Sequence, residues 1–133
     1  MNLDIYLKYI LWFVGISYGY GAVVHLVNIA GFAGYDWMAA PFKWQVLDVV
    51  YLILNLIVLV GFLRDWRPAY PCFFVAAGSQ IMLYTIFRDW ILDVPADFAR
   101  GPEHQANLDG LVLFHVVSVI IVGGIHLWRH RLT

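Results

Sequence analysis

The sequence predicts an all-α integral membrane protein, folded as a four-helix transmembrane bundle. Composition is the first reason: 62% of the residues are hydrophobic and 13% are charged, whereas soluble domains carry about 25% charged residues to solvate their surfaces. The second reason is that four long apolar runs fill most of the chain. Each is close to the ~20 residues needed to cross ~30 Å of hydrocarbon. Residues 1–133 are therefore expected to form a single four-span domain, with no separate soluble domain.

The predicted spans are residues 9–29, 44–63, 68–87 and 110–128. The first, third and fourth contain no Lys, Arg, Asp or Glu, and the second contains only Asp48. Between the first two spans, glycines, a proline and several aromatic residues bar a regular helix and suit the headgroup layer.

The loop before the fourth span is the most polar stretch of the chain. Pro95 suits a first helical position and Asp97 suits an N-terminal turn, so one helical turn is predicted near residues 95–100. Asn107 or Asp109 is predicted to cap the fourth helix.

Cations near the span ends predict the orientation, because Lys and Arg are enriched in cytoplasmic loops. With four spans, both termini lie on the same side of the membrane. That side carries five of the eight cations (Lys8, Arg64, Arg67, Arg129 and Arg131), and the other side carries three (Lys43, Arg88 and Arg100). The chain is therefore expected in the cell (inner) membrane, surrounded by membrane lipid, with both termini in the cytoplasm.

Several functional classes are excluded by composition and motifs. A net charge of −1 gives no basis for binding nucleic acid. The single cysteine, Cys72, rules out an intrachain disulfide and any zinc site built from cysteine pairs. The sequence contains neither a Gly-x-Ser-x-Gly turn nor a phosphate-binding glycine loop.

Within the spans, polar residues recur at helical spacing, so each span presents one polar face. The faces comprise Tyr18, Gly21, His25 and Asn28 in the first span, Asp48, Tyr51 and Asn55 in the second, Gln80, Tyr84 and Arg88 in the third, and His115, Ser118 and His126 in the fourth. Gly15 and Gly19 add a small-xxx-small pattern, which predicts close helix contacts within the chain.

One polar side chain from each face is predicted to lie at a similar depth, in the outer half of the bundle. His25, Asp48 and Tyr84 lie about one turn from the outer ends of their spans, and His115 lies roughly 8–10 Å in, at the helical rise of 1.5 Å. Arg88 lies just above them. A carboxylate at membrane depth is costly unless it is paired, so Asp48 is expected to pair with Arg88 or with a histidine.

These five residues form the predicted binding site. Asp48 would serve as counter-charge or proton acceptor, Arg88 as an anion partner, and the histidines as ligands or proton carriers. An alternative of equal weight is that these five side chains only fix the register of the helices and bind no ligand.

Three functions are compatible with this site. A subunit or accessory protein of a larger membrane complex, with other membrane protein subunits as partners, is favoured because six Trp and eight Tyr exceed what two interfacial belts require. In a membrane redox protein, His25, Asp48 and His115 would bind a metal, or the two histidines would ligate a haem or hydrogen-bond a quinone. The third candidate is a small proton- or ion-coupled transporter.

Overall fold

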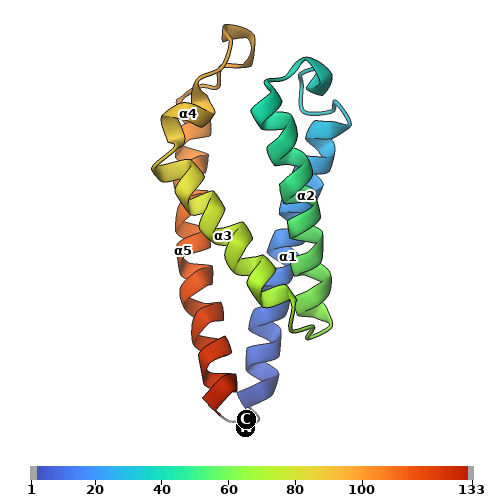
Figure 1. The fold of residues 1–133 in the computed structure, drawn as a ribbon, viewed down its shortest axis with the longest axis vertical. Coiled ribbons are helices and arrows are strands. Elements are labelled where there is room, and N and C mark those ends of the chain that lie inside the picture. The colour runs from blue at the N-terminus through green and yellow to red at the C-terminus, as the bar shows by residue number, and fades with distance from the viewer. Residues whose placement is uncertain (1–2, 132–133) are drawn as a thin grey trace.

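The structure, a computed structural model, describes residues 3–131, and every regular element in that range is helical (Figure 1). The elements are α1 (Leu3–Ile29), the 3₁₀ helix η1 (Trp37–Ala39), α2 (Phe42–Leu63), α3 (Ala69–Thr85), α4 (Arg88–Leu92), the 3₁₀ helix η2 (Ala96–Phe98) and α5 (Pro102–Arg131). Helices α1, α2 and α5 are each long and apolar enough to cross a membrane. The chain therefore has the architecture of an all-helical integral membrane protein.

The last long helix begins earlier than predicted. It starts at Pro102, eight residues before the apolar run that begins at Gly110, so the prediction that Asn107 or Asp109 caps it is wrong. Proline suits a first helical position because its missing N–H would have no partner there, and Glu103 in the first turn favours the helix dipole. The early start carries polar side chains on α5 beyond the apolar run.

The third apolar run, residues 68–87, contains the single helix α3, and the short helix α4 follows directly after it. Helix α3 has 17 residues and ends at Thr85, and α4 follows after a turn at residues 86–87. At the break, the Thr85 hydroxyl donates back to the Ile81 carbonyl at 2.6 Å, and the Phe87 N–H bonds to the Met82 carbonyl five residues back. Helix α3 is therefore shorter than α1, α2 and α5, and it runs obliquely between them (Figure 1).

Two chain segments form what we call the loop end of the molecule, residues 30–41 and 93–101, opposite the end where α1 begins and α5 finishes (Figure 1). Gly31 and Gly34 have φ angles of 78° and 86°, which favour glycine. The helical turn predicted near residues 95–100 is confirmed as η2.

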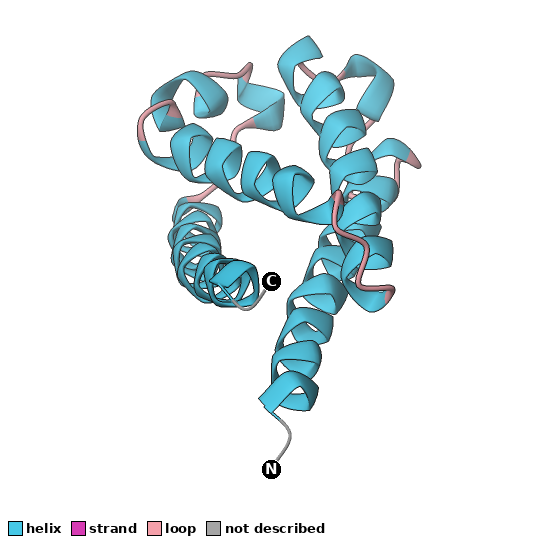
Figure 2. Ribbon diagram, turned by 60° about the horizontal axis from the view of Figure 1, so that its bottom comes forward, coloured by secondary structure: helices cyan, strands magenta, loops and turns pink. Residues whose placement is uncertain are grey.

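Helix packing is tight at one end and loose at the other. A Cβ on Gly15 would lie 3.1 Å from the Phe62 Cβ, and one on Gly19 would lie 3.0 Å from the Leu59 side chain, which confirms the predicted close contacts within the chain. A buried cluster then closes the half of the molecule near the termini; it includes Leu11, Val14, Val58, Phe62, Phe73 and Val122. Helix α5 packs mainly on α3, whereas α1 packs mainly on α2 (Figure 2). Because α1 and α5 scarcely contact each other, the two pairs leave space between them toward the loop end.

Candidate ligand-binding site

A cavity of about 970 Å³ lies toward the loop end, between the α1–α2 pair and the α3–α5 pair. Helix α1 lines it along a single face, with Phe13, Ile16, Ser17, Tyr18, Tyr20, Gly21, Val24, His25 and Asn28. The other elements contribute mostly apolar and aromatic side chains, among them Trp44, Leu47, Ile91, Leu92, Leu108, Leu111 and Phe114. The walls are therefore largely hydrophobic, with a few polar groups set into them.

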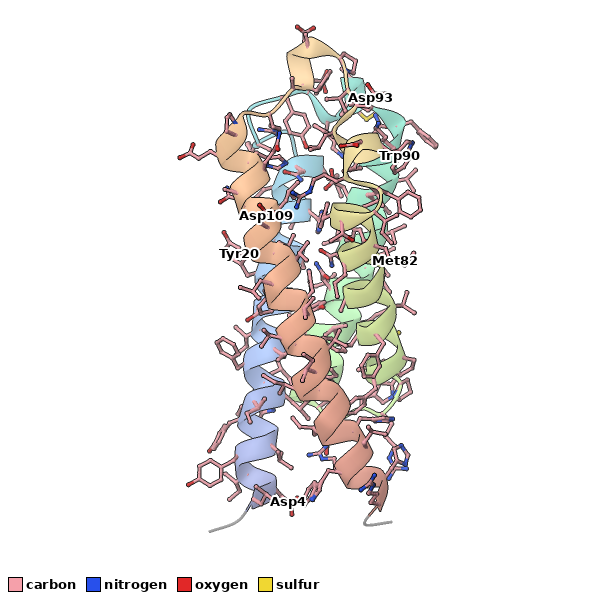
Figure 3. The ribbon with its side chains drawn as sticks, turned by 90° about the vertical axis from the view of Figure 1, so that its left-hand side faces the viewer. Asp4, Tyr20, Met82, Trp90, Asp93 and Asp109 are labelled. Carbon is pink, nitrogen blue, oxygen red and sulfur yellow. The ribbon has the colours of Figure 1, made fainter. Side chains whose placement is uncertain are left out.

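Four of the five predicted site residues line this cavity: His25, Asp48, Tyr84 and His115. They come from four different helices, because each polar face turns toward the same space. Arg88 does not line the cavity. Its guanidinium bonds to the carboxylate of Asp109, which Figure 3 labels, at 2.5 Å and to the Tyr84 carbonyl at 2.8 Å. Of the partners expected for Asp48, the structure therefore shows a histidine, His25, and Arg88 pairs instead with Asp109 of α5.

Asp48 is buried, with 6% of its surface exposed, and it accepts three hydrogen bonds. Its Oδ1 accepts from His25 Nδ1 at 2.7 Å and from Asn28 Nδ2 at 2.9 Å, and its Oδ2 accepts from Trp37 Nε1 at 3.0 Å. Three donors satisfy a carboxylate in a medium where an unpaired one would be costly. The His25 ring also stacks on Tyr51, with ring centroids 5.8 Å apart. The imidazole is therefore held from two sides.

A second polar pair lies deeper in the cavity. His115 Nδ1 and the Tyr18 hydroxyl are 3.0 Å apart, linking α5 to α1. The other ring nitrogen, His115 Nε2, is fully buried and has no hydrogen-bond partner among residues 3–131. Within the same described range, Asn55 Oδ1 is likewise buried and unpartnered. Both residues are 3% exposed and line the cavity, so two cavity-lining side chains each carry a buried polar atom without a partner.

The polar groups fall on two levels. On α1, Tyr18 and His25 are seven residues apart, and on α2 Asn55 and Asp48 are also seven apart, which corresponds to about 10 Å along each helix. The outer level is the His25–Asp48 pair, and the inner level contains the Tyr18–His115 pair together with Asn55.

Aromatic side chains gather at the loop end, beside the cavity. The rings of Tyr35, Trp44 and Phe98 meet edge to face with centroids 5.9–6.2 Å apart. Arg100 lies over the Tyr35 ring, 5.2 Å from its centroid. Burial raises the pKa of the Tyr35 phenol, the Asp48 carboxylate raises it further, and Arg100 opposes the rise. The phenol therefore stays neutral and able to donate.

The first turn of α2 is bonded to α4 and to Asp93, the residue that follows it. Lys43 Nζ donates to the carbonyls of Trp90 and Asp93, two residues labelled in Figure 3. The Trp44 indole donates to the Ile91 carbonyl at 3.0 Å. These bonds join the two sides of the cavity at the loop end.

The predicted metal ligands do not come together. No group of three or more His, Cys, Asp or Glu side chains in the part of the chain that the structure describes is placed to hold a metal ion. His25 and Asp48 share a hydrogen bond, but His115 bonds to Tyr18 at the deeper level. Since the two histidines lie at different levels, the arrangement favours an elongated ligand over one iron shared by both.

Sequence reasoning missed Trp37 and Asn28 as partners of Asp48, and Tyr18 as the partner of His115. Asn28 and Tyr18 belong to the polar face of α1, so helical spacing had already placed them near the site. Trp37 begins the three-residue 3₁₀ helix η1 in the connector, which is too short to show a periodicity in the sequence, and only the folded chain could show its contact.

The fold and the cavity together describe an all-helical membrane protein with a largely apolar cavity that contains a few buried polar groups. The chain matches no protein-family model, and neither the curated proteins nor the solved structures contain a significant match. The function is therefore inferred from the geometry of the cavity and its polar side chains.

Proposed function

We propose that this is a four-span protein of the cell membrane, with both termini in the cytoplasm, that binds a lipid-soluble molecule bearing an oxygen-containing head group. The ligand occupies the cavity between the α1–α2 and α3–α5 pairs. Three side-chain atoms among residues 3–131 are buried without a partner, and the observation that carries the proposal is that two of them, His115 Nε2 and Asn55 Oδ1, belong to residues that line the cavity. Buried polar groups in native proteins are nearly always paired, so such atoms mark a place for a ligand or an ordered water.

The walls favour a lipophilic ligand. Pockets that bind small organic molecules are mostly apolar with a few placed polar groups, and volumes of about 300–1,000 Å³ are usual. Phe13, Ile16 and Tyr20 line the cavity and are nevertheless 68%, 59% and 74% exposed. Because these residues belong to a membrane-crossing helix, the cavity would open sideways toward lipid. A ligand dissolved in the bilayer could then enter without passing through water.

Binding is better supported than transport. Below the Tyr18–His115 pair, the cluster that includes Leu11, Val58, Phe73 and Val122 fills the bundle with apolar side chains. A polar solute would have no hydrogen-bonding path through that half.

Equilibrium binding of 4-nonylphenol to the protein in lipid nanodiscs tests the proposal. We expect saturable binding at about one molecule per chain, and at least fivefold weaker binding of its methyl ether, which lacks the hydroxyl donor. Empty nanodiscs supply the background for partition into lipid. Equal, non-saturable uptake of both compounds would contradict a built site.

Thiol labelling tests the orientation. In a Cys72→Ala background, Gln105→Cys and Arg131→Cys place single thiols on exposed positions at opposite ends of α5. With an impermeant maleimide on intact cells, we expect Gln105→Cys to react and Arg131→Cys to react only after the membrane is opened. The reverse pattern would show that the orientation is the opposite of the one proposed. Labelling of both positions from one side would show that α5 does not cross the membrane.

A role as a subunit of a larger membrane complex stands as a second candidate. It is supported by the same open side of the cavity, where the exposed rings of Phe13 and Tyr20 offer a partner helix an aromatic surface. Native electrophoresis after mild solubilisation would separate a complex from a free chain.

A further inference from the structure

We propose that the cavity recognises a lipid-soluble 1,4-hydroquinone in preference to the corresponding quinone. This inference rests on the proposed function and names the ligand class of the same site. The preference for the hydroquinone follows from the hydrogen-bond donors and acceptors at the two polar levels.

The inner level offers one donor. The Tyr18 hydroxyl has His115 Nδ1 as its hydrogen-bond partner. We assign the hydroxyl as donor, because the opposite choice would leave the phenolic hydrogen without a partner among the described residues. The imidazole proton then resides on Nε2, the buried atom that has no partner within residues 3–131. His115 Nε2–H therefore requires an acceptor from the ligand.

The inner level also offers one acceptor. Asn55 Oδ1 is buried without a partner in the described chain, and its amide nitrogen lies against α1, where a Cβ on Gly21 would approach within 2.7 Å. A lone pair in this position requires a donor. A hydroxyl group both accepts and donates, so one hydroxyl would satisfy His115 and Asn55 together. A quinone carbonyl would satisfy His115 alone.

The outer level repeats this preference. Asp48 accepts a hydrogen bond from His25 Nδ1, so Nδ1 carries the proton and His25 Nε2 in the neutral ring is an acceptor. His25 lines the cavity. A second hydroxyl on the ligand would donate to His25 Nε2. A second carbonyl could not, because both the carbonyl oxygen and His25 Nε2 are acceptors.

The spacing suits a ring with oxygens at opposite corners. The two oxygens of a 1,4-hydroquinone are about 5 Å apart, and hydrogen bonds of about 2.8 Å at each end bring the span to roughly 11 Å. The levels are about 10 Å apart along α1 and along α2. Tyr51, Tyr84 and Phe114 line the cavity and supply flat aromatic surface for the ring. An alkyl tail would leave beside α1 into lipid.

The experiment compares a radiolabelled decyl-1,4-hydroquinone with its quinone, in anaerobic nanodiscs containing the full chain. We expect the hydroquinone to bind at least tenfold more tightly, because the quinone leaves two acceptors unpaired. Equal affinities, or tighter binding of the quinone, would overturn this inference if 4-nonylphenol still binds. If none of the three compounds binds saturably, the proposed function fails as well.

A variant isolates the inner acceptor. Asn55→Leu keeps a similar volume and orphans no other group, since the Asn55 side chain has no hydrogen-bond partner among the described residues. We expect it to weaken hydroquinone binding about fivefold or more, with little change for the quinone. Met82→Leu, on the exposed face of α3 outside the cavity, is the matched control and should change neither affinity (Figure 3). An undiminished preference in Asn55→Leu would contradict the assigned role of Asn55.

Discussion

Asp48→Leu should destabilise the protein by about 3–5 kcal/mol, because it leaves three donors unpaired and an unpaired buried donor costs about 1–3 kcal/mol. The substitution leaves three donors, from His25, Asn28 and Trp37, pointing at a methyl group. It also removes the bond from Trp37 to α2, and leaves only Gln45 of α2 donating to the connector carbonyls of Trp37, Met38 and Ala40. The measurement is the thermal midpoint in detergent, followed with a thiol-reactive dye at Cys72, the only cysteine, which is partly buried against the core.

Asp48→Asn is the informative control. Its amide oxygen can still accept from Trp37, and its NH₂ group can donate to His25 and Asn28 after the His25 tautomer and the Asn28 amide reverse. We therefore expect a much smaller loss of stability than for the leucine variant. The reversal would put the His25 proton on Nε2, so the preference for the hydroquinone should fall. Equal destabilisation by both substitutions would show that the hydrogen-bond set is not what holds this end together.

Gly61→Ala should cost about 1–3 kcal/mol through overpacking. A Cβ at this position would lie 2.2 Å from the Ala69 Cβ and 3.5 Å from the Trp66 ring. Ala69 is fully buried at the start of α3, so the added methyl can be accommodated only by moving α3 away from α2. The same dye measurement at Cys72 reports the shift.

Two further variants separate this contact from general effects of the substitution. Gly78→Ala lies in α3 with no described heavy atom within 4 Å of the new Cβ, and it should be neutral or slightly stabilising because alanine favours helix. The exchange Gly61→Ala with Ala69→Gly moves the methyl group across the contact and should recover part of the loss. If Gly61→Ala were as stable as Gly78→Ala, the close approach of α2 and α3 would be disproved.

The apolar runs and their polar faces could be predicted from the sequence because both depend on local properties. Hydrocarbon thickness sets the length of a span, and the 3.6-residue period sets which residues share a face. The second run, residues 44–63, therefore coincides with α2 to within two residues. The same reasoning identified His25, Asp48, Tyr84 and His115, all of which line the cavity.

Only the tertiary structure decided which polar groups pair. Arg88 bonds to Asp109 because α5 begins at Pro102 and brings that carboxylate beside the start of α4. Asp48 instead takes Trp37 from the connector, a contact that no periodicity describes. The two levels of the site likewise depend on how α1, α2 and α5 are placed relative to one another. Local sequence sets the face and depth of a side chain, but a hydrogen bond needs an atom from another helix within about 3 Å, and helix packing determines that distance.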